Sequence, residues 1–361
     1  MGNISRAKVL MVQGTASGVG KSFLVTALCR LFARRGLRVA PFKAQNMSLN
    51  SYVTPDGLEV ARAQAVQAEA AGIEVRAEMN PILLKPEGET RAQVVLLGRP
   101  IASLAAGDYL NQRQKWWDTV LSCLRRLQRA YDLVVAEGAG SPAEVNLLER
   151  DIANMRLAQA VRAPVLLVGD IDRGGVFASL VGTLALLPPA QHRLVRGLVI
   201  NRFRGDPAIL TPGLRFLEKR IGVPVLGVIP YARDIRLPEE DSQGLEERLH
   251  RPRRALLDIA VLRLPHIANF DDLDPLDQEE GVGLRWIERA GDLDTPDLLI
   301  IPGSKTTIPD LLWLQKKGLA ASLRRLAGTG TPVVGLCGGY QMMGKALHDP
   351  HGIESPIREA E

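Results

Sequence analysis

Cysteine and aromatic residues are scarce in this sequence. Its 361 residues include three cysteines, Cys29, Cys123 and Cys337, and only 4% are phenylalanine, tryptophan or tyrosine. Cysteines this few and this far apart exclude a disulfide framework and a zinc knuckle, and they favour a reducing compartment. Because no aromatic residues are interleaved with the basic runs, the chain lacks the base-stacking pattern of a nucleic-acid-binding protein.

Long apolar runs are also absent. The amino-terminal residues lead directly into a short strand-like run, 9–12, without the apolar core of a signal peptide. No run approaches the ~18 residues that a membrane span needs. The charges nearly balance, because 45 lysines and arginines oppose 40 aspartates and glutamates for a net charge of +5. We therefore expect a cytoplasmic protein that binds small anionic molecules rather than a membrane or a nucleic acid.

Short apolar runs recur along the chain, each followed by glycine or acidic residues and then by a segment with helical spacing. Continuous runs of this kind are typical of strands buried on both faces, and their alternation with helices predicts parallel α/β sheets. At 46% hydrophobic residues, the chain is long enough for two such domains. The runs lie at 9–12, 133–136, 165–168, 198–200 and 225–229, and again at 259–262, 298–301 and 333–336.

A change of composition separates the two series of runs. Residues 238–254 pass from acidic to basic with almost no apolar periodicity, which is typical of an interdomain linker. We therefore predict a first α/β domain over 1–240, a linker over 241–255 and a second α/β domain over 256–361.

The first run ends in a glycine-rich loop, Gly14 to Ser22, that opens a helix. Glycines let backbone N–H groups surround phosphate oxygens, and the helix N-terminus favours negative charge. Five residues separate the outer glycines, where the common loop has about four; this longer loop resembles that of dethiobiotin synthetase. A glycine-rich turn without a ligand is the structural alternative. We expect the loop to bind ATP through Gly14, Thr15, Gly18, Gly20, Lys21 and Ser22, with Lys21 at the β and γ phosphates and Ser22 on Mg²⁺.

Polar residues follow the other runs of the first domain, at the sheet edge where ligands of open α/β sheets bind. Glu137 is expected as a second Mg²⁺ ligand, directly or through water, unless it caps the next helix. Asp172 and Arg173 are expected to hold a carboxylate or an acyl phosphate, unless they form a local ion pair. Lys43 has a similar position, and Asn201 is expected either at the adenine edge of ATP or as a helix cap.

In the second domain, the run 333–336 leads through Cys337 and Gly338 into a helix. A nucleophile on such a turn is exposed, and the helix N-terminus stabilises a thiolate. We expect Cys337 to act as a nucleophile, with the N–H groups of Gly338 and Gly303 forming an oxyanion hole. A buried, inert cysteine is the alternative.

A cysteine nucleophile of this kind needs a histidine base that a carboxylate orients. His348 and His351 lie too close to Cys337 in sequence to return across a sheet, and we place His266 on the far loop of the first strand of its domain. The sequence therefore predicts that the chain stops before its triad is complete.

Several motifs, in this order, closely resemble the cobyric acid synthase family. The resemblance covers essentially the whole chain, and it implies ATP-dependent amidation of carboxylates b, d, e and g of adenosylcobyrinic acid a,c-diamide. The product would be adenosylcobyric acid in cobalamin synthesis, with ATP and Mg²⁺ as cofactors and ammonia from glutamine. The motifs are the phosphate loop, the cysteine elbow and the segments 42–51, 79–86, 170–177 and 201–206.

The resemblance also implies roles for residues and for the second domain. The residues implied to face the corrinoid are Lys43, Gln45, Asn46, Asn80 and Lys85. The second domain resembles a class I, triad-type glutamine amidotransferase, which in the family continues past the end of this chain and contains the histidine. We therefore expect a truncated amidotransferase domain with doubtful glutaminase activity.

Two other functions stay open. Cobyrinic acid a,c-diamide synthase shares both domain types, although the segments 43–51 and 79–86 argue against it. A nucleotide-switch ATPase of the septum-positioning kind would carry an additional lysine near the start of the loop, where this chain has Thr15 and Ala16.

Overall fold

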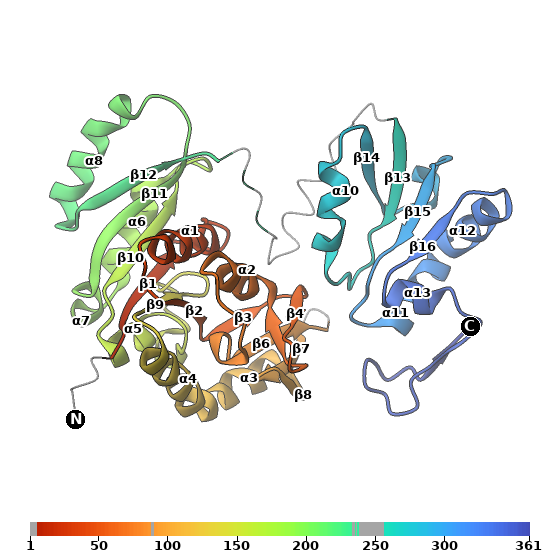
Figure 1. Ribbon diagram of the computed structural model, residues 1–361, viewed down its shortest axis with the longest axis horizontal. Helices are drawn as coiled ribbons and strands as arrows, with labels where there is room; N and C mark the ends of the chain where they lie inside the picture. The colour runs from red at the N-terminus through yellow and green to blue at the C-terminus, as the bar shows by residue number, and fades with distance from the viewer. Residues whose placement is uncertain (1–5, 88–89, 233–234, 236, 238–255) are drawn as a thin grey trace. The chain divides into compact units, whose positions relative to one another are not determined.

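A computed structural model describes residues 6–87, 90–232, 235, 237 and 256–361 (Figure 1). The chain divides into two compact units. The first comprises Met1–Met47, Tyr52–Leu84 and Gln93–Leu237, and the second comprises Ser48–Ser51, Lys85–Ala92 and Pro238–Glu361. The predicted linker, 241–255, lies outside the described residues, so the predicted domain boundaries stay a prediction.

A parallel six-stranded sheet forms the centre of the first unit. Its order, β12-β11-β10-β1-β9-β2, interleaves strands that are distant in sequence, and every neighbouring pair is parallel. The five apolar runs predicted as strands in this part of the chain are confirmed. The strands are β1 (Lys8–Gly14), β2 (Val39–Lys43), β9 (Leu133–Glu137), β10 (Val165–Asp170), β11 (Val195–Phe203) and β12 (Val225–Pro230).

Helices cover this sheet and supply the rest of the core. Leu24, Val25 and Cys29 of α1 pack against Val12, Val135 and Val168 of three neighbouring strands. The helices are α1 (Lys21–Arg34), α2 (Arg62–Ala70), α3 (Ala106–Gln112), α4 (Trp117–Ala130), α5 (Met155–Val161), α6 (Val176–Leu186), α7 (Pro189–His192) and α8 (Pro207–Ile221), with 3-10 turns η1 (Ala77–Met79), η2 (Arg113–Trp116) and η3 (Leu148–Arg150).

A second, smaller sheet was not predicted. Its strand order is β3-β6-β7-β8. The strands β4 and β5, which come between β3 and β6 in the sequence, form a separate two-stranded sheet. Most of these strands are short. β6 and β7 contain the apolar runs 82–84 and 94–96, which the sequence analysis did not identify as strands. They are β3 (Gln45–Met47), β4 (Ser51–Val53), β5 (Glu59–Ala61), β6 (Ile82–Pro86), β7 (Arg91–Leu96) and β8 (Arg99–Ala105).

The second unit is built on a parallel four-stranded sheet with the order β14-β13-β15-β16. The three predicted runs of this unit are confirmed as strands, whereas β14 was missed. The strands are β13 (Leu257–Leu262), β14 (Val282–Ile287), β15 (Leu298–Ile301) and β16 (Val333–Gly335), followed by the antiparallel pair β17 (Leu347–His348) and β18 (Glu359–Ala360). The helices are α10 (Asp274–Gln278), α11 (Thr307–Lys316), α12 (Leu319–Gly328) and α13 (Gly338–Met342), with 3-10 turns η4 (Phe270–Leu273) and η5 (Ala290–Asp292).

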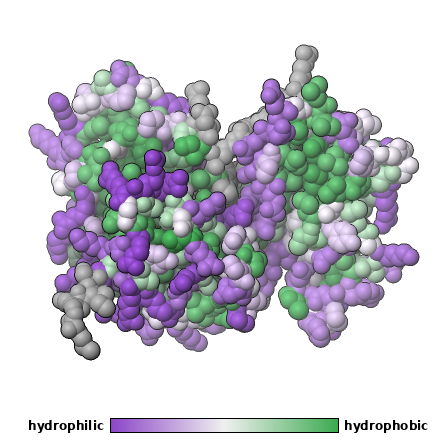
Figure 2. Space-filling view, viewed as in Figure 1, coloured by the Kyte–Doolittle hydropathy of each residue, from purple (hydrophilic) through white to green (hydrophobic). Residues whose placement is uncertain are grey.

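Both units therefore have the predicted fold class. The first contains a parallel α/β sheet with a phosphate loop after its first strand, and the second is another parallel α/β domain. Figure 2 shows polar side chains over most of the visible face of each unit, with apolar side chains gathered over the strands of the second. Among the described residues, no helix has both the length and the apolar character that a bilayer crossing requires.

The contact between α6 and β10 provides a test of the packing of the first unit. Leu180 is fully buried, and a Cβ added to Gly169 would lie 3.2 Å from its Cγ, so the helix sits directly on the strand. Leu180→Ala should lower the free energy of unfolding by about 2–5 kcal/mol, because it leaves a cavity. Leu186 belongs to the same helix but is 55% exposed. Leu186→Ala should therefore change the free energy of unfolding by less than about 0.5 kcal/mol. Equal effects in urea unfolding would contradict this packing.

Candidate functional site

The predicted phosphate loop joins β1 to α1 in a conformation that depends on glycine. Gly18 and Gly20 have φ angles of 70° and 95°, a region that residues with a Cβ rarely adopt. A Cβ on Gly20 would also lie 2.0 Å from Nδ2 of Asn201. The loop is anchored to the sheet, because the Thr15 N–H donates to the carbonyl of Val168 at 2.9 Å.

Lys21 links the phosphate loop to the loop that follows β9. Its Nζ donates to the carbonyls of Ala16 at 2.8 Å and of Gly140 at 3.1 Å, and the residue is 7% exposed. The ammonium group therefore lies between the phosphate loop and the loop after β9. These carbonyl contacts hold the lysine over the loop whose backbone is predicted to bind the phosphates.

A buried carboxylate gathers the polar groups at the carboxyl end of β9. Glu137 is fully buried, and its Oε1 accepts hydrogen bonds from Ser22 Oγ at 2.9 Å and from Lys43 Nζ at 2.8 Å. Its Oε2 accepts one from Gln67 Nε2 at 2.6 Å. Burial alone would raise the pKa of Glu137, but Lys43, Gln67 and Lys21 together hold that pKa below its ordinary value. The carboxylate is therefore ionised in the folded protein.

Sheet register explains why these side chains meet. In the parallel pair β2 and β9, Lys43 lies opposite Glu137, and Val12 of β1 lies opposite Glu137 on the other side. Because the carboxyl ends of parallel strands share one edge, residues about a hundred positions apart arrive at the same point. Gln67 comes from α2, and no pattern in the sequence identified it.

The two predicted Mg²⁺ ligands are in contact. Because Ser22 donates its hydroxyl proton to Glu137, the lone pairs of its oxygen stay available for a cation. Both oxygens of Glu137 already accept hydrogen bonds from Lys43, Ser22 and Gln67. In the described part of the chain, no three His, Cys, Asp or Glu side chains form a metal-binding group. The residues thus fit a cation held by Ser22, substrate phosphates and water, with Glu137 behind the serine.

Asn201 contacts the phosphate loop itself. Its Nδ2 donates to the carbonyl of Val19 at 2.9 Å, and the side chain is buried. This contact is the one that forbids a Cβ on Gly20. The sequence suggested two roles for Asn201, at the adenine edge of ATP or as a helix cap, and neither included this contact. Through this contact, Asn201 supports the phosphate loop.

The acidic residues at the end of β10 and just after it are paired with arginines from β11 and the loop that follows β11. Buried Asp170 accepts a hydrogen bond from Arg202 Nη1 at 2.8 Å, and Asp172 accepts two from Arg204, at 2.7 and 3.2 Å. The hydrogen bonds from Arg204 hold the pKa of Asp172 below its ordinary value. Arg173 is 58% exposed, with its Nε 3.8 Å from Asp170. Asp172 is therefore paired with Arg204 from the loop after β11 and not with its neighbour Arg173.

The residues implied to face a corrinoid have different environments. Asn46 Nδ2 donates to Gln64, and Lys85 Nζ donates to Ser51 at 3.3 Å. Both polar atoms of the Asn80 side-chain amide bond to the backbone. Its Oδ1 accepts a hydrogen bond from Ala61 N, and its Nδ2 donates to the carbonyls of Lys43 and Ile82. Asn80 therefore positions the end of β2 beside β6. Gln45, by contrast, lines a cavity.

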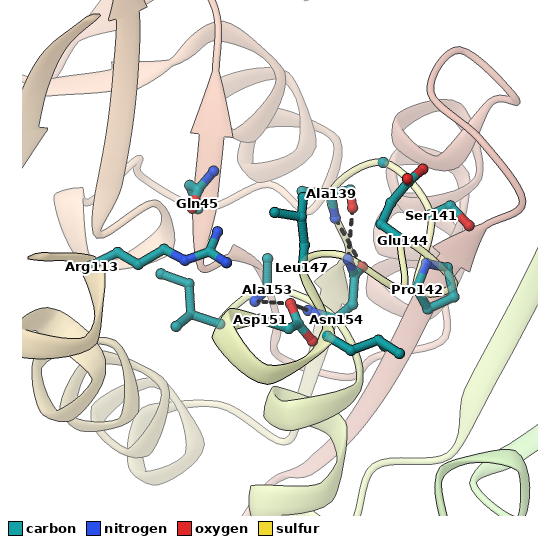
Figure 3. Close-up of a pocket in the computed structure, with 13 residues that line it drawn as sticks. Gln45, Arg113, Ala139, Ser141, Pro142, Glu144, Leu147, Asp151, Ala153 and Asn154 are labelled. Atoms are coloured by element: carbon teal, nitrogen blue, oxygen red, sulfur yellow. Dashed lines mark hydrogen bonds between the residues drawn. The ribbon is translucent and has the colours of Figure 1, made fainter. Parts of the chain in front are cut away.

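That cavity, of about 140 Å³, lies beside the phosphate loop in the first unit (Figure 3). Gly140, whose carbonyl bonds Lys21, forms part of its wall. Asn154 fixes the wall, since its amide accepts from Ala139 N at 3.1 Å and donates to Ala139 O at 2.7 Å. Gln45, Arg113 and residues 139–142, 144, 147–148 and 151–154 line it.

Gln13 is a further polar residue of this edge that the sequence did not reveal. It lies on β1 directly before the phosphate loop, is fully buried, and has no hydrogen-bond partner for either amide atom among the described residues. It is a neighbour of Gly138, where an added Cβ would lie 3.1 Å from its Cγ. Buried side-chain amides are normally hydrogen-bonded, so Gln13 is an exception to that rule at this edge of the sheet.

The cysteine of the second unit occupies the strained turn that the sequence predicted. Cys337 lies between β16 and α13 with φ 49° and ψ −112°, a region that costs about 1–3 kcal/mol for a residue other than glycine. The backbone is packed too closely for side chains around it: a Cβ on Gly339 would lie 2.1 Å from the carbonyl oxygen of Ile301. The thiol is exposed, so the inert, buried alternative is wrong.

The other two cysteines differ from Cys337. Cys29 and Cys123 are buried, and burial raises the pKa of Cys29 to about 12 and that of Cys123 to about 11. Both stay protonated thiols at neutral pH.

The two glycines of the predicted oxyanion hole lie beside the cysteine. A Cβ on Gly303 would lie 3.8 Å from the Cβ of Cys337, and one on Gly338 would lie 3.0 Å from the backbone nitrogen of Ser304. The loops after β15 and β16 are held together here, because Leu336 N donates to the carbonyl of Ile301 at 2.8 Å. The structure thus brings Gly303, Gly338 and Cys337 together.

A histidine–aspartate pair adjoins the same loop. His266 Nδ1 lies 2.8 Å from Asp310 Oδ1, and Ser304 Oγ donates to Asp310 Oδ2 at 2.7 Å. The hydrogen bond with Asp310 raises the pKa of His266, against the opposing effect of burial. The placement of His266 on a far loop is wrong, because Ala268 N donates to the carbonyl of Gly303 at 2.9 Å. Strands β13 and β15 are neighbours, so the loops that follow them meet.

Comparison with known families defines the class of protein. Residues 10–244 match the CobQ/CobB/MinD/ParA nucleotide binding domain, and residues 258–361 match the CobB/CobQ-like glutamine amidotransferase domain. These two domain matches, together with the relatives described next, show that the chain is an ATP-dependent ligase with a glutamine amidotransferase domain.

The particular family follows from curated relatives. The cobyric acid synthases of Sorangium cellulosum (strain So ce56) and Moorella thermoacetica are 56% and 55% identical to this chain over 351 and 353 residues. These matches cover 97% of this chain and 68% of each relative. The chain belongs to the cobyric acid synthase family. Among solved structures, the GDP complex of the signal recognition particle receptor FtsY from Elizabethkingia anophelis is 19% identical over 66% of this chain and 63% of that one, and its TM-score of 0.37 supports no conclusion.

The Glu137 cluster predicts a pH-dependent stability. Glu137→Gln leaves Lys43, which is 4% exposed, without its carboxylate partner and should cost about 3–5 kcal/mol of unfolding free energy near neutral pH. Because the folded-state pKa of Glu137 is lowered, its contribution is present above the ordinary value and is lost as the pH falls through the lowered one. The difference between wild type and variant should therefore shrink in acid.

A matched control for this prediction lies at the start of the same strand. Asp132 directly precedes β9 and forms an exposed ion pair with Arg38. Asp132→Asn should lower the stability far less than Glu137→Gln in urea unfolding at neutral pH. An equal loss in both variants, or a Glu137→Gln deficit that does not change with pH, would contradict the buried ion cluster.

Proposed function

We propose that this chain amidates carboxylates b, d, e and g of adenosylcobyrinic acid a,c-diamide at the expense of ATP, giving adenosylcobyric acid. The observation that carries the proposal is the cluster of Lys21, Ser22 and Glu137 at the sheet edge, where Lys21 contacts Gly140 in the wall of a cavity. The names of the relatives supply the product. We assign this step to the predicted domain 1–240, and we place the reaction in the cytoplasm.

The chemistry of the first step is transfer of a phosphoryl group to a carboxylate. A carboxylate oxygen attacks the γ-phosphorus of ATP, the bond to the bridging oxygen breaks, and an acyl phosphate and ADP form. Lys21 is the group that neutralises the transferring phosphoryl, and its present partners, the carbonyls of Ala16 and Gly140, are contacts that it can exchange. Mg²⁺, held through Ser22, would supply further charge on the phosphate oxygens.

Ammonia then completes the amide. It attacks the carbonyl carbon of the acyl phosphate, inorganic phosphate leaves with the former carboxylate oxygen, and a proton is released. The same site repeats this sequence at each carboxylate. The buried charges of Glu137 and Lys43 serve to hold Ser22 and the strand ends in place rather than to exchange protons, because both already have strong partners.

We assign the ammonia supply to the second domain, for which the sequence analysis identified a nucleophile and an oxyanion hole but no histidine base. The Cys337 thiol loses its proton and attacks the carbonyl carbon of the glutamine side-chain amide, and the N–H groups of Gly303 and Gly338 hold the developing oxyanion. The C–N bond then breaks as the nitrogen takes up that proton and leaves as ammonia. Water then hydrolyses the thioester and releases glutamate. The strained backbone of Cys337 and the proximity of both glycines support this assignment.

Two variants separate the two steps. Cys337→Ser should lower glutamine-dependent amidation by about 1,000-fold or more, since it removes the nucleophile, and it should leave the ammonium-dependent rate unchanged. Lys21→Met should lower the rate with either nitrogen source by about 100-fold or more. The measurement is mass spectrometry of the corrinoid after incubation with Mg-ATP and either glutamine or ammonium.

Each variant can overturn its own part of the proposal. Glutamine-dependent activity in Cys337→Ser would remove the cysteine from the mechanism. Ammonium-dependent activity in Lys21→Met would place phosphoryl transfer elsewhere. A wild-type chain that adds no amide to the corrinoid with ammonium would contradict the proposed function itself.

A further inference from the structure

An arginine in the first unit is buried without a partner for its binding edge. Arg113 begins η2 and is 6% exposed, yet among the described residues its Nε and Nη2 have no hydrogen-bond acceptor. Figure 3 shows its guanidinium pointing into the cavity beside the phosphate loop. A guanidinium stays charged in proteins, so it cannot escape the cost of burial by losing its proton.

The acceptors around the cavity are engaged elsewhere. Asp151 accepts hydrogen bonds from the backbone of Ala153 and Asn154, both at 2.9 Å. The carbonyl oxygen of Gln45 accepts the Tyr109 hydroxyl at 2.6 Å. Glu144 is exposed and lies across the cavity from Arg113 (Figure 3). The fold therefore places a charge in this wall and provides other partners for the nearby acceptors.

The two free nitrogens are the pair that matches a carboxylate. Nε and Nη2 lie on one side of the guanidinium, and their N–H groups point in parallel, so that they suit the two oxygens of one carboxylate. This protein uses the same edge in that way elsewhere. Nε and Nη2 bind both carboxylate oxygens in the pairs Arg38–Asp132, Arg204–Asp172 and Arg285–Asp258.

The size and position of the cavity indicate which anion it receives. At about 140 Å³ it is smaller than the about 300–1,000 Å³ of pockets that enclose a whole ligand, so it suits a single acidic arm of a larger molecule. It borders Gly140, whose carbonyl holds Lys21. An arm that enters the cavity therefore lies near the lysine predicted at the γ-phosphate.

We propose that Arg113 is a specificity-determining residue that binds a carboxylate of the acid substrate through its Nε and Nη2 edge. The inference rests on the proposed function for the identity of that acid. Phosphate is an anion of similar chemistry, but the glycine-rich loop, with its backbone N–H groups, is already predicted to bind the phosphates of the nucleotide.

The experiment compares three variants of the whole chain. Arg113→Gln removes the charge, Arg113→Lys keeps the charge without the two-pronged edge, and Arg150→Gln removes an exposed arginine close to the same wall, which bonds Asn111. Each is measured for equilibrium binding of adenosylcobyrinic acid a,c-diamide, for ATP binding, for ammonium-dependent amidation and for thermal unfolding.

Arg113→Gln should weaken corrinoid binding by about 10- to 100-fold, the usual effect of a charge-assisted pair, and should leave ATP binding unchanged. Arg113→Lys should recover only part of the affinity, and Arg150→Gln should match wild type. Thermal stability should be equal to or higher than wild type in Arg113→Gln, because the substitution removes a buried charge whose binding edge has no partner. A structural arginine would give the opposite shift.

The outcomes are decisive in either direction. Unchanged corrinoid affinity in Arg113→Gln, a selective loss of ATP affinity, or full recovery in Arg113→Lys would each overturn the inference. If wild type binds the corrinoid with the expected dependence on Arg113 but adds no amide, the proposed function fails while the carboxylate contact stands. If wild type adds amides and Arg113→Gln binds normally, the contact fails alone.

Discussion

The buried carboxylate of Glu137 is the interaction on which the candidate synthetase site depends. A carboxylate with no exposed surface is costly unless its oxygens are bound by donors and its charge is opposed. Three different elements meet that demand: the helix start through Ser22, the end of β2 through Lys43, and α2 through Gln67. The phosphate loop, the neighbouring strand and a helix are thereby tied to one point at the end of β9.

This arrangement sets the charge of the site before any ligand arrives. Lys43 is paired with Glu137, whereas Lys21 donates to two backbone carbonyls at the phosphate loop and the loop after β9. Arg113 adds a second positive group in the wall of the adjoining cavity. A buried guanidinium edge without acceptors, as in Arg113, lowers stability, and proteins accept that loss at sites of function. Lys21 and Arg113 are the two groups that we propose to bind a polyphosphate and a carboxylate.

Local patterns predicted the parts of this structure that local sequence determines. Continuous apolar runs gave β1, β9, β10, β11 and β12 because strands buried on both faces need no polar alternation. The loop from Gly14 to Ser22 and the elbow at Cys337 were predictable since each places special residues within one short segment. The sequence analysis predicted that Ser22 and Glu137 share one site, because parallel strands end at one edge of a sheet. It did not predict the hydrogen bond between them.

Contacts that depend on tertiary pairing could not be predicted in this way. The short strands β3 and β6 carry no distinctive period, and Gln67, Gln13 and Arg113 look like ordinary polar residues until the fold buries them. His266 was misplaced because β13 lies between β14 and β15 in the sheet, an order that its sequence position does not reveal. Asn80 was expected at a ligand, yet its amide is fully used by backbone.

The central claim is that this site activates a carboxylate as an acyl phosphate, and an oxygen label tests it most directly. The corrinoid acid, labelled with ¹⁸O in its carboxylates, is amidated with ammonium and ATP, and the released phosphate is analysed by mass spectrometry. Transfer through an acyl phosphate predicts one ¹⁸O atom in phosphate for each amide formed, because the attacking oxygen stays on phosphorus. Amide formation with unlabelled phosphate would contradict that route.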